Sequence, residues 1–249
     1  MTAHASSHWT EMKDLRILGI DTSGKVASVA LSDGEKILWE KSVYTKLTHS
    51  QVILPMVEQA LAESGYELSQ IDCAAVSDGP GSYTGLRIGI GAVKGMCRGC
   101  EGLKCAGVST LLSLAYNCCG FTGRIISVMR ARPDISYVGE FDGGAKAPVR
   151  VSPDRVAKDA EVFEGYDTSV PVMLVGDNAV FIKDRYFKND ENVIVANAAC
   201  VLQRASSLCL AAADSEDLIT TADKLEVSYL QATKAEKDKA HSQKQEEEK

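Results

Sequence analysis

Residues 77–89 constrain the fold of this chain more than any other segment, because this glycine-rich stretch directly follows a short apolar run. The run at residues 71–76 is typical of a strand that is buried on both faces. The glycine-rich turn after it is followed by a predicted helix that extends to about Cys100. A buried strand, a tight turn and a helix in this order favour a βαβ crossover, and therefore an α/β protein.

A phosphate cradle is the first hypothesis for such a turn, and two sequence patterns test it. A P-loop needs a lysine followed by Ser or Thr, and residues 77–89 contain no lysine. The dinucleotide fingerprint fails as well, because Gly79, Gly81 and Gly85 are spaced one residue too far apart. Asp78 adds a negative charge beside any bound phosphate. A structural turn is therefore predicted, and its residues are Asp78, Gly79, Pro80, Gly81, Tyr83 and Thr84.

The helix after the turn holds several glycines, each of which costs about 1 kcal/mol relative to alanine in a helix interior. Gly85, Gly89 and Ala92 recur at three- to four-residue spacing and form a smooth strip that another backbone can approach closely. The spacing leaves two partners open, a neighbouring element of the same chain or another subunit. Arg87 can bind the carboxylate of Asp78 or of a partner, or face water.

The first half of the chain opens with three predicted strands, at residues 16–21, 26–31 and 36–43. Short turns separate them, which predicts an antiparallel meander. Gly24 and Gly34 are expected to supply positive φ in these two turns.

A helix is predicted next, capped by Ser50 and extending to about Ser64. Pro55 removes one backbone donor, so the helix begins near Leu54 or has a kinked first turn. Leu54 and Met56 fall outside the apolar face and are expected to form a contact patch. The residues of the apolar face are Ile53, Val57, Ala60 and Leu61.

A strand at residues 105–108 and a helix at 110–118 complete a first half of roughly βββαβα form. The second half has predicted strands at 124–129, 136–141, 149–151 and 172–175, and a helix at 198–213. We therefore expect four regions: a flexible tail at 1–14, an N-terminal lobe at 15–113, a C-terminal lobe at 114–230 and a charged, disordered tail at 231–249.

Composition limits the classes of function. The net charge of −7 and the pI near 5.2 argue against a broad basic face that binds nucleic acid. No apolar run reaches the roughly 18 residues of a membrane span, and the start is polar, so we expect a cytoplasmic protein. The eight cysteines are expected to be reduced. Cys97 with Cys100, and Cys118 with Cys119, lack a second ligand pair for zinc.

Three segments, at residues 18–23, 48–51 and 77–89, resemble the TsaB (YeaZ) family of bacterial tRNA threonylcarbamoyladenosine synthesis. The resemblance covers residues 17–113, with weaker similarity at 175–177 and 228–230. It implies an actin-like ATPase and ribonuclease H-like fold, with two lobes of βββαβα type and mixed sheets.

The resemblance also implies a function, that of a non-catalytic scaffold that binds and activates TsaD. TsaD is the related subunit that transfers threonylcarbamoyl to N6 of adenosine 37 in tRNAs reading ANN codons. TsaE is expected to join the complex with ATP or ADP at its interface, and tRNA is contacted only indirectly. The chain is expected to form homodimers when TsaD is absent, and the resemblance assigns no cofactor to this chain itself.

The family places its interface on the helices after Ser50 and after Thr84. Adding bulk at Gly89 is therefore expected to weaken dimerisation or TsaD binding while the monomer stays folded. The interface residues expected on this basis are Ser50, Leu54, Met56, Gly85, Arg87, Gly89, Ala92 and Met96.

The metal pair of TsaD, an HxxxH motif, is not expected to function here. Only His4 and His8 have that spacing, and they lie in the polar N-terminal tail. His49 has no second histidine nearby, so a hydrogen bond at a helix start is expected instead.

Three positions depart from the family pattern. Residues 130–132 read Arg-Ala-Arg where the family has Asp-Ala-Arg, and residues 176–179 read Gly-Asp-Asn-Ala in place of GDGA. Gln231 follows Tyr-Leu where the family has arginine. These changes argue against nucleotide binding in the second half and leave the first-half interface intact.

Two enzymatic functions stay open. In an ATP-dependent phosphotransferase or hydrolase of the actin-like superfamily, Asp21 would position a metal-bound water and Thr22 or Ser23 would contact phosphate. An aspartate that leaves a strand also commonly caps the following turn. A peptidase is the third hypothesis, and no GxSxG motif supports it.

Overall fold

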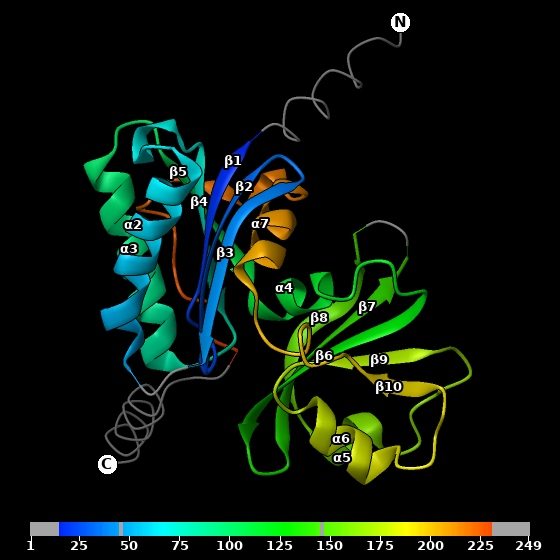
Figure 1. Ribbon diagram of the computed structural model, residues 1–249. Helices are drawn as coiled ribbons and strands as arrows, with labels where there is room; N and C mark the ends of the chain where they lie inside the picture. Colours follow the sequence, from blue (N-terminus) through cyan, green and yellow to red (C-terminus); the bar gives the residue numbers. More distant parts are fainter. Residues whose placement is uncertain (1–14, 45–46, 145–146, 231–249) are drawn as a thin grey trace, which may run out of the picture.

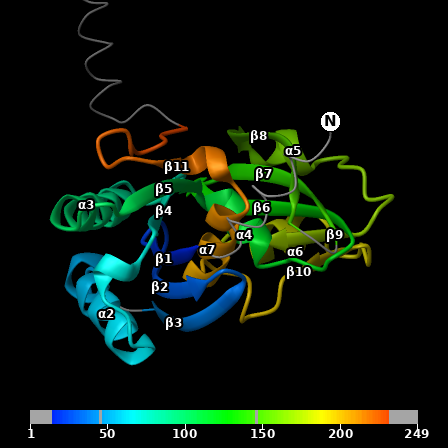
Figure 2. The same cartoon turned by 90° about the horizontal axis from the view of Figure 1, so that it is seen from above.

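The computed structural model describes residues 15–44, 47–144 and 147–230 (Figure 1). The predicted tails, with His4 and His8, lie outside the described residues. Two mixed sheets form the molecule, and seen from above they lie next to each other with helices α4 and α7 between them (Figure 2). The first sheet has the strand order β11-β5-β4-β1-β2-β3 and the second has the order β10-β9-β6-β7-β8. The predicted α/β class with mixed sheets is confirmed.

The predicted meander is confirmed. Strands β1 (Arg16–Asp21), β2 (Val26–Asp33) and β3 (Lys36–Tyr44) pair antiparallel in sequence order. β2 is buried along nearly all its length, because α2 covers one face of the sheet and α7 the other. β3 is an edge strand and stays partly exposed.

The two turns of the meander use glycine for different reasons. Gly34 has a φ of 57°, as predicted. Gly24 is not among the glycines with positive φ, so the prediction for that turn is wrong. A Cβ at Gly24 would lie 2.7 Å from the side-chain amide of Gln203. Gly24 therefore allows a close approach between the first turn and the segment before α7.

Helix α2 (His49–Ser64) begins before the predicted cap. Its N-cap is Thr48, whose backbone N–H donates to Oε1 of Gln51 at 3.1 Å, so Ser50 lies inside the helix. Pro55 also lies inside the helix, which shows that the helix does not begin near Leu54.

The burial of α2 confirms most of the predicted apolar face. Ile53, Val57 and Ala60 are buried. Met56 is only 4% exposed, so its placement in an exposed contact patch is wrong. The stripe is wider than the helical spacing of Ile53 and Val57 alone suggests, because β2 and β3 both contact this helix. Leu54 is 49% exposed, as expected for a residue outside the stripe.

The central crossover is confirmed. β4 (Cys73–Gly79) lies parallel to β1 and to β5 (Lys104–Ser109), and α3 (Tyr83–Gly99) connects β4 to β5. The strand includes Asp78 and Gly79, and the helix includes Tyr83 and Thr84, so the turn itself is shorter than residues 77–89. The Gly79–Pro80 peptide bond is cis.

The second sheet contains the four predicted strands, and this half of the chain adds one strand and two helices that the sequence pattern did not predict. The predicted strands are β6 (Gly123–Arg132), β7 (Ile135–Gly143), β8 (Val149–Lys158) and β9 (Val172–Val175). The additional elements are β10 (Val193–Val195), α5 (Asp159–Phe163) and α6 (Ala179–Tyr186). All three are short, so they show little periodicity.

The helices between the sheets come from distant parts of the chain. α4 (Thr110–Tyr116) contacts α7 (Ala205–Ala213), which begins later than the predicted residue 198. α7 also contacts β1, and β11 (Ile219–Thr220) pairs with β5. The division into lobes at 15–113 and 114–230 stays a prediction. In the structure, α7 and β11 of the second half pack on or pair with strands of the first sheet.

Two further observations describe the molecule as a whole. The eight cysteines lie within the described residues, and they are free. No helix in the described ranges is long and apolar enough to cross a membrane.

Helix α3 packs on the turn between β1 and β2 through two glycines. A Cβ at Gly85 would lie 2.0 Å from the backbone oxygen of Thr22, and a Cβ at Gly89 would lie 2.5 Å from Thr22 Oγ1. A Cβ at Gly89 would also lie 3.0 Å from a methyl group of Val76. For these two glycines the partner is the chain's own turn. This contact argues against the expectation that bulk at Gly89 leaves the monomer undisturbed, and that expectation stays a prediction.

This contact gives a matched pair of variants. We expect Gly89→Ala to lower the free energy of unfolding by about 1–3 kcal/mol, because the added methyl group overpacks the contact with Thr22. Gly91→Ala, where no atom lies within 4 Å of the new Cβ, is expected to raise it by up to about 1 kcal/mol through helix propensity. Urea denaturation of both variants measures the difference. Equal effects would contradict the assigned contact.

Candidate functional site

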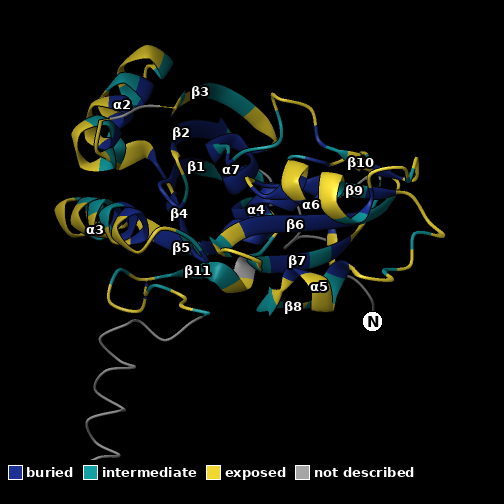
Figure 3. Ribbon diagram, turned by 90° about the horizontal axis from the view of Figure 1, so that it is seen from below, coloured by how far each residue is buried: buried dark blue, intermediate teal, exposed yellow. Residues whose placement is uncertain are grey.

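Helices α2 and α3 lie side by side on the outer face of the first sheet, and their outward sides are exposed (Figure 3). The structure separates the predicted interface residues into three groups. Ser50, Leu54 and Arg87 are exposed. Ala92 and Met96 are partly buried against the core. The remaining three, Met56, Gly85 and Gly89, are buried within the chain's own fold.

The exposed stripe of α3 differs from the predicted strip. Tyr83, Arg87, Gly91 and Gly95 follow one another at four-residue spacing, and all four are exposed. No atom of the structure lies within 4 Å of a Cβ built at Gly91 or Gly95. Unlike Gly85, these two glycines have no packing partner among the described residues.

An aromatic cluster lies at the N-terminal end of this stripe. The rings of Tyr83 and Tyr229 stack with centroids 5.4 Å apart. The guanidinium carbon of Arg87 lies 4.1 Å from the centre of the Tyr83 ring, and Arg87 Nε donates to the hydroxyl of Tyr229 at 3.1 Å. Tyr229 was missed as a site residue because it is far away in sequence, and the weak family similarity at residues 228–230 was its only signal.

The residues predicted to contact nucleotide form a buried polar junction at the end of β1. Asp21 is 0% exposed. Its Oδ1 accepts from the backbone N–H and the hydroxyl of Ser23, at 2.9 and 2.7 Å, and its Oδ2 accepts from the hydroxyl of Ser77 at 2.5 Å. Burial raises the pKa of Asp21, and the hydrogen bonds from Ser77 and Ser23 oppose that rise.

The rest of this turn is also bonded within the chain. The Thr22 hydroxyl donates to the backbone oxygen of Gly85 at 2.7 Å. The backbone oxygen of Ser23 accepts from the N–H of Ser82 at 2.7 Å. Thr22 and Ser23 are 0% and 1% exposed. The arrangement joins α3 to the end of β1 and leaves no open cradle around these side chains.

Residues of the second sheet's half of the chain lie close to the turn between β1 and β2. The backbone N–H of Arg130, near the end of β6, donates to Oδ1 of Asp177 at 2.9 Å. Burial raises the pKa of Asp177, and this hydrogen bond and the charges of Lys25 and Arg130 oppose the rise. Lys25 belongs to the turn between β1 and β2, so the positive charges around Asp177 come from both halves of the chain. No group of three or more His, Cys, Asp or Glu in the described part of the chain is arranged to hold a metal ion.

Asp78, a half-buried residue of the predicted turn, lies at the end of β4. Loss of solvent around its carboxyl group raises its pKa to about 7; a backbone hydrogen bond opposes this rise, and the negative charge of Asp154 on β8 contributes to it. A Cβ built at Gly107 would lie 3.0 Å from Oδ2 of Asp78. The carboxyl group of Asp78 therefore lies close to Gly107 of β5 and within reach of the charge of Asp154.

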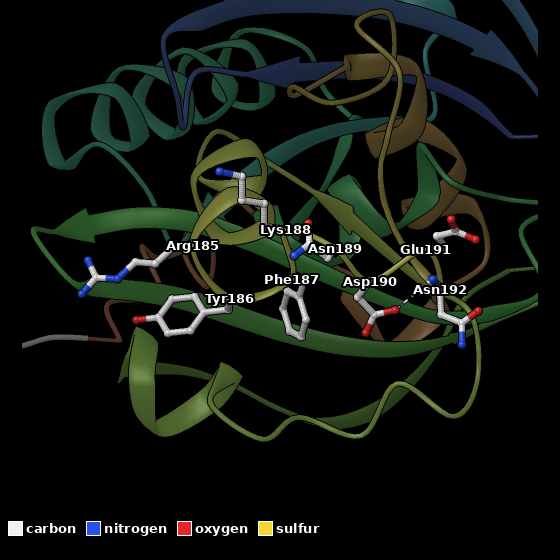
Figure 4. A pocket seen from close by; sticks show the side chains of 8 residues that line it. All are labelled: Arg185, Tyr186, Phe187, Lys188, Asn189, Asp190, Glu191 and Asn192. Carbon is white, nitrogen blue, oxygen red and sulfur yellow. Dashed lines mark hydrogen bonds between the residues drawn. The ribbon is translucent and has the colours of Figure 1, made fainter.

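A hollow of about 640 Å³ lies beside the end of α6 (Figure 4). One continuous segment, residues 185–192, lines it. Lys183 fixes this loop by donating to the backbone oxygens of Phe187 and Asp190, both at 2.6 Å. None of the predicted site residues lines the hollow.

Comparison with known proteins gives a consistent family assignment. The family model described as TsaD, tRNA N6-adenosine threonylcarbamoyltransferase, matches residues 44–238. The tRNA threonylcarbamoyladenosine biosynthesis protein TsaB of Bacillus subtilis is 30% identical over 175 residues, which are 66% of this chain and 76% of that protein. TsaB of Escherichia coli is 39% identical over 129 residues, 51% of this chain and 55% of that protein.

TsaB of Haemophilus influenzae is 40% identical over 105 residues, 42% of this chain and 43% of that protein. The chain thus matches only about half the length of the Escherichia coli and Haemophilus relatives. Among solved structures, YeaZ from Pseudomonas aeruginosa has a TM-score of 0.74 at 25% identity. The comparison covers 87% of this chain and 100% of that one. An uncharacterized protein from Pseudomonas aeruginosa with similarity to peptidase YeaZ gives a TM-score of 0.75 with the same identity and coverage.

The raised pKa of the Asp78 carboxyl group predicts that the stability of the protein depends on pH. Its pKa is about 7 in the folded protein and near 3.8 without burial, so the folded state holds a proton that the unfolded chain has released between these values. The stability that Asp78 contributes therefore falls as pH rises from about 4 to about 7 and is constant above. Asp78→Asn stays neutral and does not show this fall.

Urea denaturation at a series of pH values measures this pH dependence of the free energy of unfolding. We expect the free energy of unfolding of Asp78→Asn, relative to the unmodified protein, to increase between about pH 4 and pH 7. Asp184→Asn, which removes an exposed aspartate on α6, controls for the loss of one negative charge. Parallel curves for Asp78→Asn and the unmodified protein would contradict the assignment.

Proposed function

Because this chain belongs to the TsaB (YeaZ) family, within the actin-like ATPase superfamily, we propose that it is a non-catalytic subunit that binds TsaD and activates it. The reaction of the complex is the threonylcarbamoylation of N6 of adenosine 37 in tRNAs reading ANN codons. TsaE and ATP or ADP join the assembly, and tRNA is contacted through the other subunits. The proposed site of action is the cytoplasm, because the tRNA substrate of the pathway is found there. In the absence of TsaD the chain forms homodimers.

The exposed stripe of α3 carries this proposal. Glycine destabilises a helix by about 1 kcal/mol relative to alanine, and Gly91 and Gly95 have no contact in the described structure that offsets it. A helix of another protein that packs closely on the stripe supplies such a contact, because glycine allows two backbones to approach. Leu54, 49% exposed on the neighbouring α2, adds an apolar side chain to the same face.

The buried polar junction supports a non-catalytic role. Each oxygen of the Asp21 carboxylate accepts hydrogen bonds from the chain's own serines, and Thr22 is bonded to α3. A catalytic aspartate that positions a metal-bound water needs at least one accessible oxygen. An ATPase activity of the isolated protein that is abolished by Asp21→Ala would support the phosphotransferase alternative instead.

Reconstitution tests the function as a whole. We expect TsaD and TsaE to modify tRNA slowly or not at all alone, and at full rate after addition of this chain. The measurement is threonylcarbamoyladenosine formed per unit time from purified components. Full activity of TsaD and TsaE without this chain would contradict the proposed role.

Two substitutions test the surface. Leu54→Glu and Gly91→Leu are each expected to weaken TsaD binding at least about tenfold, because one places a charge and the other places bulk in a close helix contact. Calorimetric titration with TsaD measures the affinity. Val180→Glu on α6, where Val180 is 58% exposed, is the matched control and should bind like the unmodified chain. Unchanged affinity of both test variants would show that α2 and α3 are not the interface.

A further inference from the structure

Residues 225–229 form a C-terminal segment that lies across the end of β4 and reaches α3. Leu225 is 2% exposed and belongs to the apolar core between the first sheet and helices α2 and α3. The N–H of Ser228 donates to the backbone oxygen of Asp78 at 2.8 Å. A Cβ at Gly79 would lie 2.3 Å from the backbone oxygen of Ser228, so this backbone contact depends on glycine. The C-terminal segment is thus fixed to the fold before it reaches Tyr229.

Tyr229 is held at one end of the exposed stripe of α3. Its ring stacks on Tyr83, the first residue of α3, and its hydroxyl accepts from Arg87 one turn further on. Tyr83 and Tyr229 nevertheless remain 45% and 37% exposed. Two ordered tyrosines beside an arginine are the side-chain types that dominate the binding energy of protein interfaces.

The aromatic cluster and the glycines form one continuous surface. Tyr83, Arg87, Gly91 and Gly95 share a face of α3, with Tyr229 stacked on the first of them. A helix that packs closely over Gly91 and Gly95 therefore meets the two tyrosines at the end of its contact. The tyrosine rings fit an aliphatic or aromatic side chain of that helix.

We propose that the C-terminal segment is a third element of the TsaD-binding surface, and that Tyr229 is one of its anchor residues. This inference rests on the proposed function. It extends the interface from two neighbouring helices to a residue contributed by the other end of the chain. Tyr229 contacts the partner directly, while Leu225 and Ser228 set its position.

Calorimetric titration of TsaD with three variants of the full chain tests the proposal. We expect Tyr229→Ala to weaken binding at least about tenfold. Tyr229→Phe keeps the stacked ring and is expected to stay within about threefold of the unmodified chain. Phe181→Ala is the matched control, because Phe181 on α6 is 42% exposed and Arg185 lies over its ring at 5.6 Å. Its affinity should not change.

Hydrogen exchange separates a direct contact from an effect on the fold. Amides of residues 225–230 in the unmodified chain should gain protection when TsaD is added, and Tyr229→Ala should melt within about 2 °C of the unmodified chain. If the unmodified chain binds TsaD but Tyr229→Ala binds equally well, or if residues 225–230 gain no protection, this inference is wrong and the proposed function stands. If the unmodified chain does not bind TsaD, both are wrong.

Discussion

The contact between the first turns of α3 and the turn after β1 determines the arrangement around it. Gly85 and Gly89 bring the helix so close that the Thr22 hydroxyl bonds to the backbone of α3. That approach buries the Thr22 side chain and fixes the orientation of the helix on the sheet. The same helix consequently turns Arg87 and Gly91 to solvent. The face of α3 that packs on the chain's own turn and the face that we propose as a binding surface are thus opposite sides of one helix.

Much of the fold could be predicted because its signals are local. The meander, the buried strand β4 and the helix after it follow from apolar runs separated by glycine turns. Errors arose where distant contacts decide the outcome. Met56 is buried on a helix that packs against two strands, β2 and β3, and Gly24 is required because Gln203 approaches from a distant part of the chain. Helix α2 begins at His49 because Thr48 and Gln51 form a capping box. The sequence pattern alone indicates Ser50 as the cap instead.

The candidate surface was only partly predictable for the same reason. Leu54 and Arg87 are exposed as expected, since each faces away from its helix's apolar stripe. The spacing of the glycines in α3 could not show which of them face the sheet, because both sets recur every four residues. Only the structure divides them into Gly85 and Gly89, against Thr22, and Gly91 and Gly95, in open space. Tyr229 joins Tyr83 across 146 positions of sequence, a pairing without a local signal.

The pairing of β11 with β5 has a consequence for biosynthesis. The strands of the second sheet all lie within residues 123–195, whereas the first sheet needs β11 at residues 219–220 for its last edge. A ribosome therefore exposes every strand of the later sheet before the earlier sheet can close. Until α7 emerges, the part of the apolar face of β1 and β2 that α7 covers is exposed. Transiently exposed apolar surface of this kind makes a nascent chain prone to aggregate.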